Sequence, residues 1–400
     1  MWQRDVLEDA CTYISRGISP KYTEEGGVLV INQKCVRNHS IDYSLARRHD
    51  IEKKNVKPER FIQKGDVLIN STGQGTLGRV AQVREEPPEL TTVDSHVTIV
   101  RPNLEKFYLD YFGYALIQIE DGLKKSGQGT SGQTELAKTK VQKEFFASYP
   151  NDRQEQQRIV AKLDAAFAEI DRAVELVEAK QVNAERLKVS LLGSSLKGVD
   201  ATWKTVTLGD ALRIARGGSP RPIKSFITDT DDGINWIKIG DSTQGGRYIE
   251  STKEKIKPSG ISRSRYVKSG DFLLSNSMSF GRPYILKTDG CIHDGWLVLS
   301  NYEEIFTSDY LYYLLSSAVV QNQFEELARG STVRNLNTEL VSSVVVSLPP
   351  LAEQQRIVAK LDAAFAEIDT VFATTTLAKE NYLALKASIL AEELSPSEAA

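Results

Sequence analysis

The sequence predicts an α+β chain in which two mixed α/β domains are joined and followed by long helices. The first observation is an internal repeat, because residues 155–171 and residues 353–369 both read EQQRIVAKLDAAFAEID. The two copies lie 353 − 155 = 198 residues apart. Each copy begins an apolar stripe with helical spacing, and a domain-sized segment precedes each copy. A period this long indicates a duplicated domain-plus-helix unit instead of a solenoid.

We expect five segments, whose order gives the chain a pseudo-twofold internal repeat. A globular segment of about 150 residues has an ordinary size for one domain. The segments are a first globular domain over 1–150, a central helix over 151–198, a second globular domain over 199–350, a C-terminal helix over 351–394 and a disordered tail over 395–400.

Short apolar runs bounded by turn residues predict strands in both globular segments. The predicted strands lie at Gly27–Ile31, Val67–Ile69, Val97–Val100, Asn235–Ile239 and Leu297–Ser300, with a last extended segment at Val344–Leu348. Each segment also contains an aromatic-rich helix, near Lys106–Glu120 in the first and near Ser308–Leu327 in the second.

The two globular segments share short anchor motifs, whereas the sequences between these motifs differ. Both carry Arg-Gly-x-Ser-Pro, at residues 16–20 and 216–220. Both also carry a Gly-Asp turn before an apolar run, and we assign Asp66 and Asp271 to these turns and not to function. Since the segments share little between the anchors, we interpret them as one scaffold with two different contact surfaces.

The helical stripes predict that the two long helices pair as an antiparallel coiled coil. A helix from about Arg153 to Leu196 would be ~65 Å long, which is too long for one side of a small domain. Gln181 and Lys379 interrupt the stripes and can set the register, whereas Thr374–Thr376 weaken the middle of the second helix. The stripes are Ile159, Leu163, Phe167, Ile170, Val174, Val177, Ala184, Leu187 and Leu191 in the first copy, and Ile357, Leu361, Phe365, Ile368, Val371, Phe372, Tyr382, Leu385 and Ile389 in the second.

Composition and charge narrow the class of protein. Three scattered cysteines and the lack of a signal-like or membrane-length apolar run suit a reducing cytoplasm. The formal net charge is −3, without the basic surplus of a free-standing DNA binder. A DNA reader of this composition would need its cations on one face, or a partner that supplies the phosphate contacts.

Catalytic motifs are missing from the sequence. It contains no phosphate-binding G-x-x-x-x-G-K-[ST] loop, no G-x-S-x-G nucleophile and no zinc-type Cys/His spacing. Residues 73–78 match G-x-G-x-x-G, but without a following helix they predict a tight loop and not a dinucleotide site. We therefore expect no catalytic residue and no metal site in this chain.

The combination of features resembles the specificity subunit of type I restriction–modification systems. That family has two variable α+β domains, each followed by a near-duplicate helix entered through Pro-x-x-Glu-Gln-x-x-Ile. In this chain the signature runs from Pro350 through Glu353 and Gln354 to Ile357. The first copy runs from Pro150 to Ile159 and has two extra residues.

The resemblance implies a non-catalytic DNA-reading role in the cytoplasm. Each globular half would be a target recognition domain that reads one half of a split, asymmetric site on double-stranded DNA. The helices would fix the spacing of the half-sites and dock two copies of a modification (methyltransferase) subunit. A restriction subunit would complete the complex, and S-adenosylmethionine, ATP and Mg would be bound by these partners.

Candidate site residues follow from their chemistry. Arg and Lys can read guanine, Asn and Gln can read adenine, and Ser or Thr can support either. The candidates are Lys34, Arg37, Asn38, Arg79, Gln128 and Thr130 in the first half, and Arg221, Lys224, Arg247, Asn276, Arg282 and Arg334 in the second. Expected coiled-coil and partner positions are Ile159, Leu163, Phe167 and Ile170, with Ile357, Leu361, Phe365 and Ile368.

Two other functions remain open from the residues alone. One is a non-catalytic coiled-coil scaffold with two protein-binding domains, which the neutral charge suits. The other is a stand-alone nuclease or methyltransferase, against which the missing motifs argue. Exchange of one globular half should change only half of the recognised sequence if the readout is modular.

Overall fold

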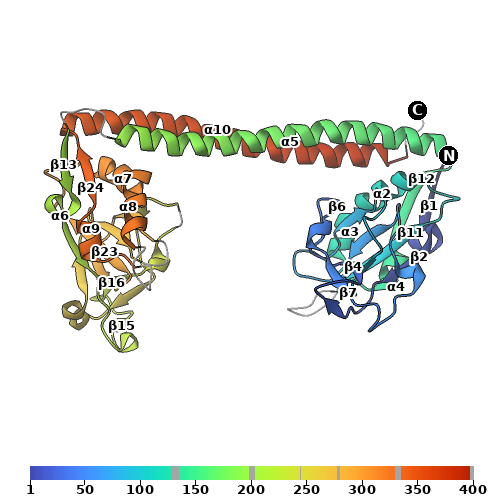
Figure 1. Cartoon of the computed structure of the whole chain (residues 1–400), viewed down its shortest axis with the longest axis horizontal. Helices are drawn as coiled ribbons and strands as arrows, with labels where there is room; N and C mark the ends of the chain where they lie inside the picture. The colour runs from blue at the N-terminus through green and yellow to red at the C-terminus, as the bar shows by residue number, and fades with distance from the viewer. Residues whose placement is uncertain (128–134, 198–202, 244, 277–279, 329–334, 397–400) are drawn as a thin grey trace. The chain divides into compact units, whose positions relative to one another are not determined.

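The computed structural model describes residues 1–127, 135–197, 203–243, 245–276, 280–328 and 335–396. Contacts divide the chain into two compact units. The first unit comprises Met1–Leu176 with Leu377–Ala400, and the second comprises Val177–Thr376. Each unit therefore holds one globular domain and a stretch of each long helix (Figure 1).

The first domain is a mixed α/β domain with short strands and short helices. Its helices are α1 (Leu7–Ala10), α2 (Leu109–Gln118), α3 (Glu120–Lys125) and α4 (Lys138–Glu144), with 3-10 turns η1 (Tyr43–Leu45) and η2 (Pro58–Arg60). Its strands are β1 (Trp2–Val6), β2 (Cys11–Arg16), β3 (Tyr22–Thr23), β4 (Val28–Ile31), β5 (Val36–Arg37), β6 (Ser40–Ile41), β7 (Arg47–His49), β8 (Val67–Asn70), β9 (Val80–Gln82), β10 (Thr91–Val93), β11 (Val97–Pro102) and β12 (Phe146–Pro150).

The second domain repeats this plan. Its helices are α6 (Leu208–Ala211), α7 (Ser308–Ser316), α8 (Ala318–Ala328) and α9 (Thr338–Ser342), with 3-10 turns η3 (Ile223–Ser225), η4 (Ile239–Asp241) and η5 (Pro258–Arg263). Its strands are β13 (Lys204–Thr207), β14 (Arg213–Arg216), β15 (Ile227–Thr228), β16 (Ile234–Ile237), β17 (Tyr248–Ile249), β18 (Glu254–Ile256), β19 (Arg265–Val267), β20 (Phe272–Ser275), β21 (Pro283–Leu286), β22 (Gly290–Ile292), β23 (Trp296–Ser300) and β24 (Val345–Leu348).

Each domain stacks two sheets in the same order. The inner sheet is β2-β11-β8-β9 in the first domain and β14-β23-β20-β21-β17 in the second. The outer sheet is β10-β4-β7-β3 in the first and β15-β18-β16-β22-β19 in the second. One pair in each outer sheet is parallel, β10 with β4 and β16 with β22. A short β1–β12 or β13–β24 pair ties the ends of each domain together.

The cores lie between the layers. In the second domain Ile237 and Ile292 of the outer sheet pack with Leu273 and Val298 of the inner sheet. On its opposite face the inner sheet packs with α7 and with apolar residues of both long helices. The first domain has the same two cores. The outer face of the outer sheet is therefore the face that is turned away from the helices.

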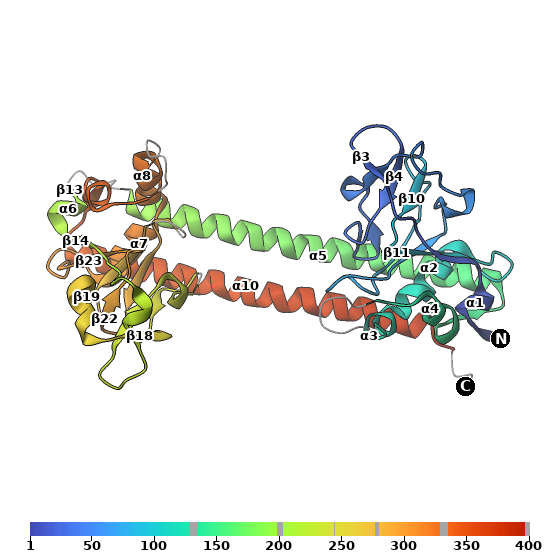
Figure 2. The same cartoon turned by 90° about the horizontal axis from the view of Figure 1, so that it is seen from below.

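One long helix follows each globular domain. Helix α5 covers Arg153–Leu196 and α10 covers Leu351–Glu393. Within each unit a stretch of α5 lies beside an antiparallel stretch of α10 (Figure 2). The expected coiled-coil positions Ile159, Leu163, Phe167, Ile170, Ile357, Leu361, Phe365 and Ile368 are all buried in these cores. The predicted fold class is confirmed.

Two details of the helical stripes differ from the sequence prediction. Leu187 and Leu385 are about half exposed, so they lie off the buried stripe, whereas Leu390 and Leu394 are buried. The stripe drifts because a 3.6-residue helix does not keep one face over many turns. The threonines do not interrupt α10, since Thr374 and Thr375 hydrogen-bond back to carbonyls one turn earlier.

The ends of the predicted strands fall within two residues of the observed ones. The run predicted over Asn235–Ile239 ends as a strand at Ile237, because Ile239 begins the turn η4. The helix predicted near Ser308–Leu327 is two helices, since Ser317 is extended between α7 and α8. Residues 73–78 form the predicted tight loop, with positive φ at Gly73, Gly75 and Gly78.

Candidate nucleic-acid interface

A buried glutamine fastens the first domain to the start of α5. Gln156 Oε1 accepts a 2.7 Å hydrogen bond from the backbone N–H of Tyr108, the residue before α2. Its Nε2 donates to the carbonyls of Lys106 and Pro150 at 2.8 and 2.9 Å. The amide thus hydrogen-bonds three backbone groups at the junction between the domain and the helix.

Gln354 repeats this arrangement in the second unit. Its Oε1 accepts from the N–H of Thr307 at 2.8 Å, and its Nε2 donates to the carbonyls of Ile305 and Pro349 at 2.9 and 3.1 Å. Both glutamines are fully buried. The repeat therefore preserves a set of contacts between domain and helix, and not only a helical surface.

A tyrosine–aspartate pair forms a second fastening in the first unit. Tyr114 of α2 donates from its hydroxyl to Asp164 of α5, and its ring meets Phe167 edge-on at 5.5 Å between centroids. Burial and the Asp164 carboxylate raise the pKa of Tyr114, so the hydroxyl keeps its proton.

The second unit carries the equivalent trio. Tyr313 donates to Asp362, and its ring meets Phe365 at 5.5 Å. Burial together with Asp362 likewise raises the pKa of Tyr313. Because Asp164 and Asp362 lie within the identical seventeen residues, identity there is explained by a shared way of holding two domains.

An arginine packs over the junction tyrosine in each unit, but it comes from a different element. Arg84 follows β9, lies 4.6 Å from the Tyr114 ring centroid and forms a 2.8 Å ion pair with Asp164. Arg247 precedes β17, lies 5.7 Å from the Tyr313 ring centroid and 4.5 Å from the Tyr312 ring centroid, and pairs with Asp309 of α7. The structure thus engages Arg247 at the junction between domain and helix, and its candidate role as a DNA reader has no support there.

The Arg-Gly-x-Ser-Pro motifs occupy the same place in both domains. A Cβ at Gly17 would lie 1.9 Å from the Val93 carbonyl oxygen, and one at Gly217 would lie 2.2 Å from the His293 carbonyl oxygen. Only glycine allows this approach between the end of an inner strand and the end of an outer strand. In the second domain the motif leads into a chain that bounds a surface pocket.

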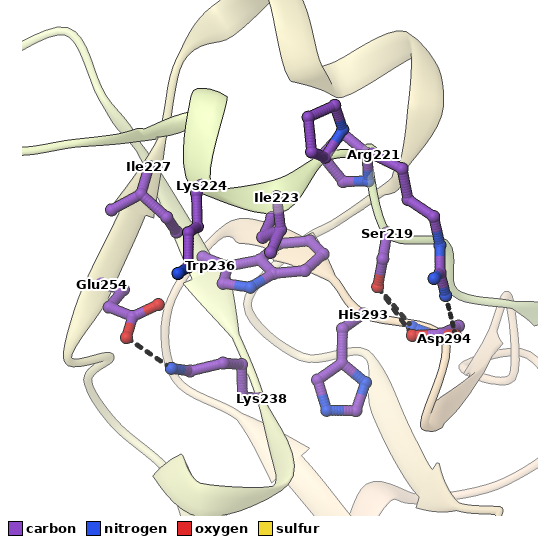
Figure 3. A pocket seen from close by; sticks show the side chains of 12 residues that line it. Ser219, Arg221, Ile223, Lys224, Ile227, Trp236, Lys238, Glu254, His293 and Asp294 are labelled. Carbon is purple, nitrogen blue, oxygen red and sulfur yellow. Dashed lines mark hydrogen bonds and ion pairs between the residues drawn. The ribbon is translucent and has the colours of Figure 1, made fainter.

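This pocket has a volume of about 840 Å³ and lies on the outer face of the outer sheet. Figure 3 shows Trp236 and Ile223 in it, with charged side chains around them. Lys238 forms a 2.7 Å ion pair with Glu254. The candidates Arg221 and Lys224 both line the pocket and are exposed.

Hydrogen bonds fix the charge state of the loop that faces Arg221. Ser219 Oγ donates to Asp294 at 2.6 Å, and this bond outweighs burial and lowers the pKa of Asp294. Arg221 lies 3.6 Å from the same carboxylate. Burial lowers the pKa of His293, so the imidazole beside the pocket is neutral at pH 7. The cations at the rim are therefore Arg221, Lys224 and Lys238.

The remaining candidates of the second half are placed differently. Asn276 is only 3% exposed, and its amide donates to the Asp294 carbonyl, so it supports the loop instead of facing solvent. Arg282 is half-buried and directly precedes β21. Arg334 lies outside the described residues, as do Gln128 and Thr130 of the first half.

The first-half candidates gather around the β5–β6 turn. Arg37 and Asn38 are exposed there, and Asn38 has a φ of 49°. Lys34 is exposed on the neighbouring loop. Asn70 Nδ2 donates a hydrogen bond to the Gln33 carbonyl of this loop. Arg79 donates to the Gly75 carbonyl, so its guanidinium braces the tight loop.

Sequence reasoning missed Gln156, Gln354, Tyr114, Tyr313 and the two aspartates as functional positions. A signal existed for the glutamines, because each is a polar residue inside the family signature, three positions before its isoleucine. No signal marked Trp236, Lys238 or Glu254. Within the described ranges no group of three or more His, Cys, Asp or Glu is placed to hold a metal ion. None of the helices there is both long and apolar enough to span a membrane.

Comparison with known proteins identifies similar sequences. Residues 200–374 match the family model described as the type I restriction modification DNA specificity domain. A protein named as the type I restriction enzyme MjaX specificity subunit, from Methanocaldococcus jannaschii, is 23% identical over 378 residues. That match covers 90% of this chain and 86% of the relative.

Solved structures share the fold. A chain from a structure concerned with assembly of the type I restriction–modification system superposes with a TM-score of 0.77 at 20% identity, covering 98% of this chain and 97% of that one. The HsdS subunit from Thermoanaerobacter tengcongensis gives a TM-score of 0.58 at 20% identity, covering 98% and 96%.

Proposed function

This chain belongs to the family of type I restriction–modification specificity subunits, and from that premise we propose that it selects the DNA sequence on which such a complex acts. Each globular domain reads one half of a split, asymmetric site on double-stranded DNA. The chain itself performs no reaction. S-adenosylmethionine, ATP and Mg belong to its partners.

The observation that carries this proposal is a contrast within each unit. The glutamine and tyrosine–aspartate contacts that hold each domain on its helix are the same in both units. The exposed surfaces of the outer sheets, by contrast, carry different side chains. Repeated contacts between domain and helix, combined with two different exposed surfaces, suit two domains that recognise different DNA sequences. A scaffold for one kind of protein partner would have kept both surfaces alike.

The paired helices support a second element of the proposal, in which they fix the number of unread base pairs. A gap between half-sites must respect the helical repeat of DNA, so the connector has to be stiff. Helices α5 and α10 are continuous over their whole lengths. Gln181 Nε2 donates to Thr375 Oγ1 at 2.9 Å, and such a polar layer fixes the register of two helices.

The duplicated helix surface supports the docking of two copies of a modification subunit. Glu155 pairs with Arg158 on the exposed side of α5, and Glu353 pairs with Arg356 in the same way on α10. Two identical partners need two identical surfaces. The near-neutral charge of the chain also suits a complex in which the partner supplies phosphate contacts. A restriction subunit completes the assembly.

Methylome sequencing of a host that carries this chain with its modification subunit tests the proposal. We expect a split motif that disappears when the chain is absent. Replacement of residues 1–150 by the corresponding domain of a relative should change one half of the motif and leave the other half and the gap intact. A change in both halves, or a motif that does not depend on the chain, would contradict modular reading and favour the protein-binding scaffold.

A further inference from the structure

The backbone register defines which residues of the two outer sheets correspond. Ile18 N–H donates to the Val93 carbonyl, and Gly218 N–H donates to the Ile292 carbonyl in the same way. Val93 pairs with Ile31, and Ile292 pairs with Ile237. Ile31 and Ile237 are therefore equivalent, and so are their neighbours.

When this register is followed across the outer sheet, each pocket residue of the second domain can be assigned an equivalent residue in the first domain. Trp236 lies opposite Glu254 on β16 and β18, and the equivalent pair is Val30 opposite Arg47 on β4 and β7. Directly opposed residues of antiparallel strands project from the same face. The equivalences are Trp236 with Val30, Glu254 with Arg47, Lys238 with Asn32 and Ile227 with Tyr22.

These equivalent positions carry opposite chemistry. In the second domain Glu254 and Lys238 form an ion pair at the edge of an open, apolar pocket. In the first domain the Arg47 guanidinium stacks 3.4 Å above the Tyr22 ring, and Asn32 donates to the Leu45 carbonyl. Val30 is fully buried where the second domain has an indole. The scaffold is shared, so the difference lies in what each face can recognise.

We propose that the outer face of the outer sheet is the base-reading surface of each domain, with Glu254 and Lys238 selecting bases in one half-site and Arg47 in the other. This inference rests on the proposed function and assigns residues to it. A carboxylate accepts from the amino groups of cytosine or adenine, whereas a guanidinium fork fits guanine. Stacking on Tyr22 holds the fork in place before DNA arrives, which reduces the ordering cost of binding.

The surroundings of the pocket suit a duplex. Arg221 has an 81% exposed side chain at the rim, and Lys224 is exposed beside it. Cations in this position reach phosphates, and the apolar side chains of Ile223 and Ile227 line the pocket beside the partly exposed Lys238–Glu254 pair. Phosphate contacts position a protein on DNA, and contacts to base edges supply the choice of base.

The test uses this chain assembled with its modification subunit and duplexes that vary one base pair at a time across both half-sites. Glu254→Gln should reduce discrimination at a base pair of the second domain's half-site by about tenfold or more, as expected for one lost base contact. Arg47→Lys, which keeps the charge and loses the fork, should do the same in the other half-site. Arg221→Ala should weaken binding to all sequences alike and reduce its salt dependence.

Matched controls make the same chemical changes elsewhere. Glu304→Gln and Arg213→Lys alter exposed residues outside the outer sheet of the second domain and should leave discrimination at every position unchanged. Unaltered discrimination in both Glu254→Gln and Arg47→Lys, or a uniform loss across all sequences, would overturn the inference. If the wild-type complex still selects a split site in that case, the proposed function stands. If the wild type selects no split site, the proposed function itself fails.

Discussion

Lys386 of α10 places its Nζ 2.7 Å from Asp171 of α5, and the ammonium also lies 4.7 Å from the Phe167 ring centroid. The second unit repeats the pair, with Lys188 3.2 Å from Asp369. The two lysines are 386 − 188 = 198 positions apart, and the two aspartates are 369 − 171 = 198 positions apart, which is the period of the repeat. Each lysine lies beyond the identical segment, so the pairing preserves residues that the letter-for-letter repeat does not include.

Reversal of the charge at Lys386 should weaken the first unit modestly. Lys386→Glu faces Asp171 with a like charge, so we expect a loss of about 0.5–1 kcal/mol in the free energy of unfolding, as for partly exposed ion pairs. The double variant Lys386→Glu with Asp171→Lys should recover most of this loss. Urea unfolding in a double-mutant cycle measures the coupling. Equal losses of unfolding free energy in the single and double variants would show that Lys386 and Asp171 are not energetically coupled.

Removal of the buried amide at Gln156 should cost much more. Gln156→Ala removes the hydrogen bonds to the Tyr108 N–H and to the Lys106 and Pro150 carbonyls, and a buried group left unpaired costs about 1–3 kcal/mol. We expect about 2–4 kcal/mol of destabilisation, measured by urea unfolding. Gln157→Ala changes the same residue type one position along, where the side chain is exposed, and should cost less than about 0.5 kcal/mol. Similar effects of the two substitutions would refute a fastening role for the amide.

Glycine at position 217 should not tolerate a methyl group. A Cβ there would lie 2.2 Å from the His293 carbonyl oxygen, so Gly217→Ala has to displace the loop that bounds the pocket. We expect several kcal/mol of destabilisation, on the scale of overpacked sites. Gly240→Ala is the control, because a Cβ at Gly240 meets no atom within 4 Å. Thermal unfolding of both variants distinguishes a steric requirement from a general intolerance of the domain.

The fold followed from the sequence because its determinants are periodic or repeated. The seventeen-residue repeat marked both helices, and the helical stripe marked the buried faces of Ile159 and Ile357. The drift of the stripe past Leu187 and Leu385 was not predictable, since it depends on how two helices supercoil. Nor was the break at Ser317, where no glycine or proline marks the end of α7.

The site was less accessible because it depends on contacts between distant strands. Trp236 and Glu254 lie on two strands separated in sequence, and Lys238 directly follows the first of them. Only the pairing of these strands brings the three residues to one pocket. Residue type alone made both Arg247 and Arg221 candidates for base reading. In the structure Arg247 packs against Tyr312, whereas Arg221 is exposed. Residue type predicts what a side chain can read, but burial decides whether it is available.

Acid should reveal the contribution of Glu120. Burial opposes the charged carboxylate, but hydrogen bonds from His39, Lys124 and the Val80 N–H outweigh burial and lower the pKa of Glu120 to about 2. A lowered pKa in the folded state stabilises the fold above the ordinary glutamate pKa of 4.5, and this stabilisation is lost as the pH falls toward 2. We therefore expect wild type to lose up to about 3 kcal/mol more than Glu120→Gln between these pH values. Asp121→Asn, at a neighbouring side chain that is 84% exposed, is the matched control. Parallel pH profiles of unfolding free energy for wild type and Glu120→Gln would contradict this account, because the glutamine variant cannot titrate at that position.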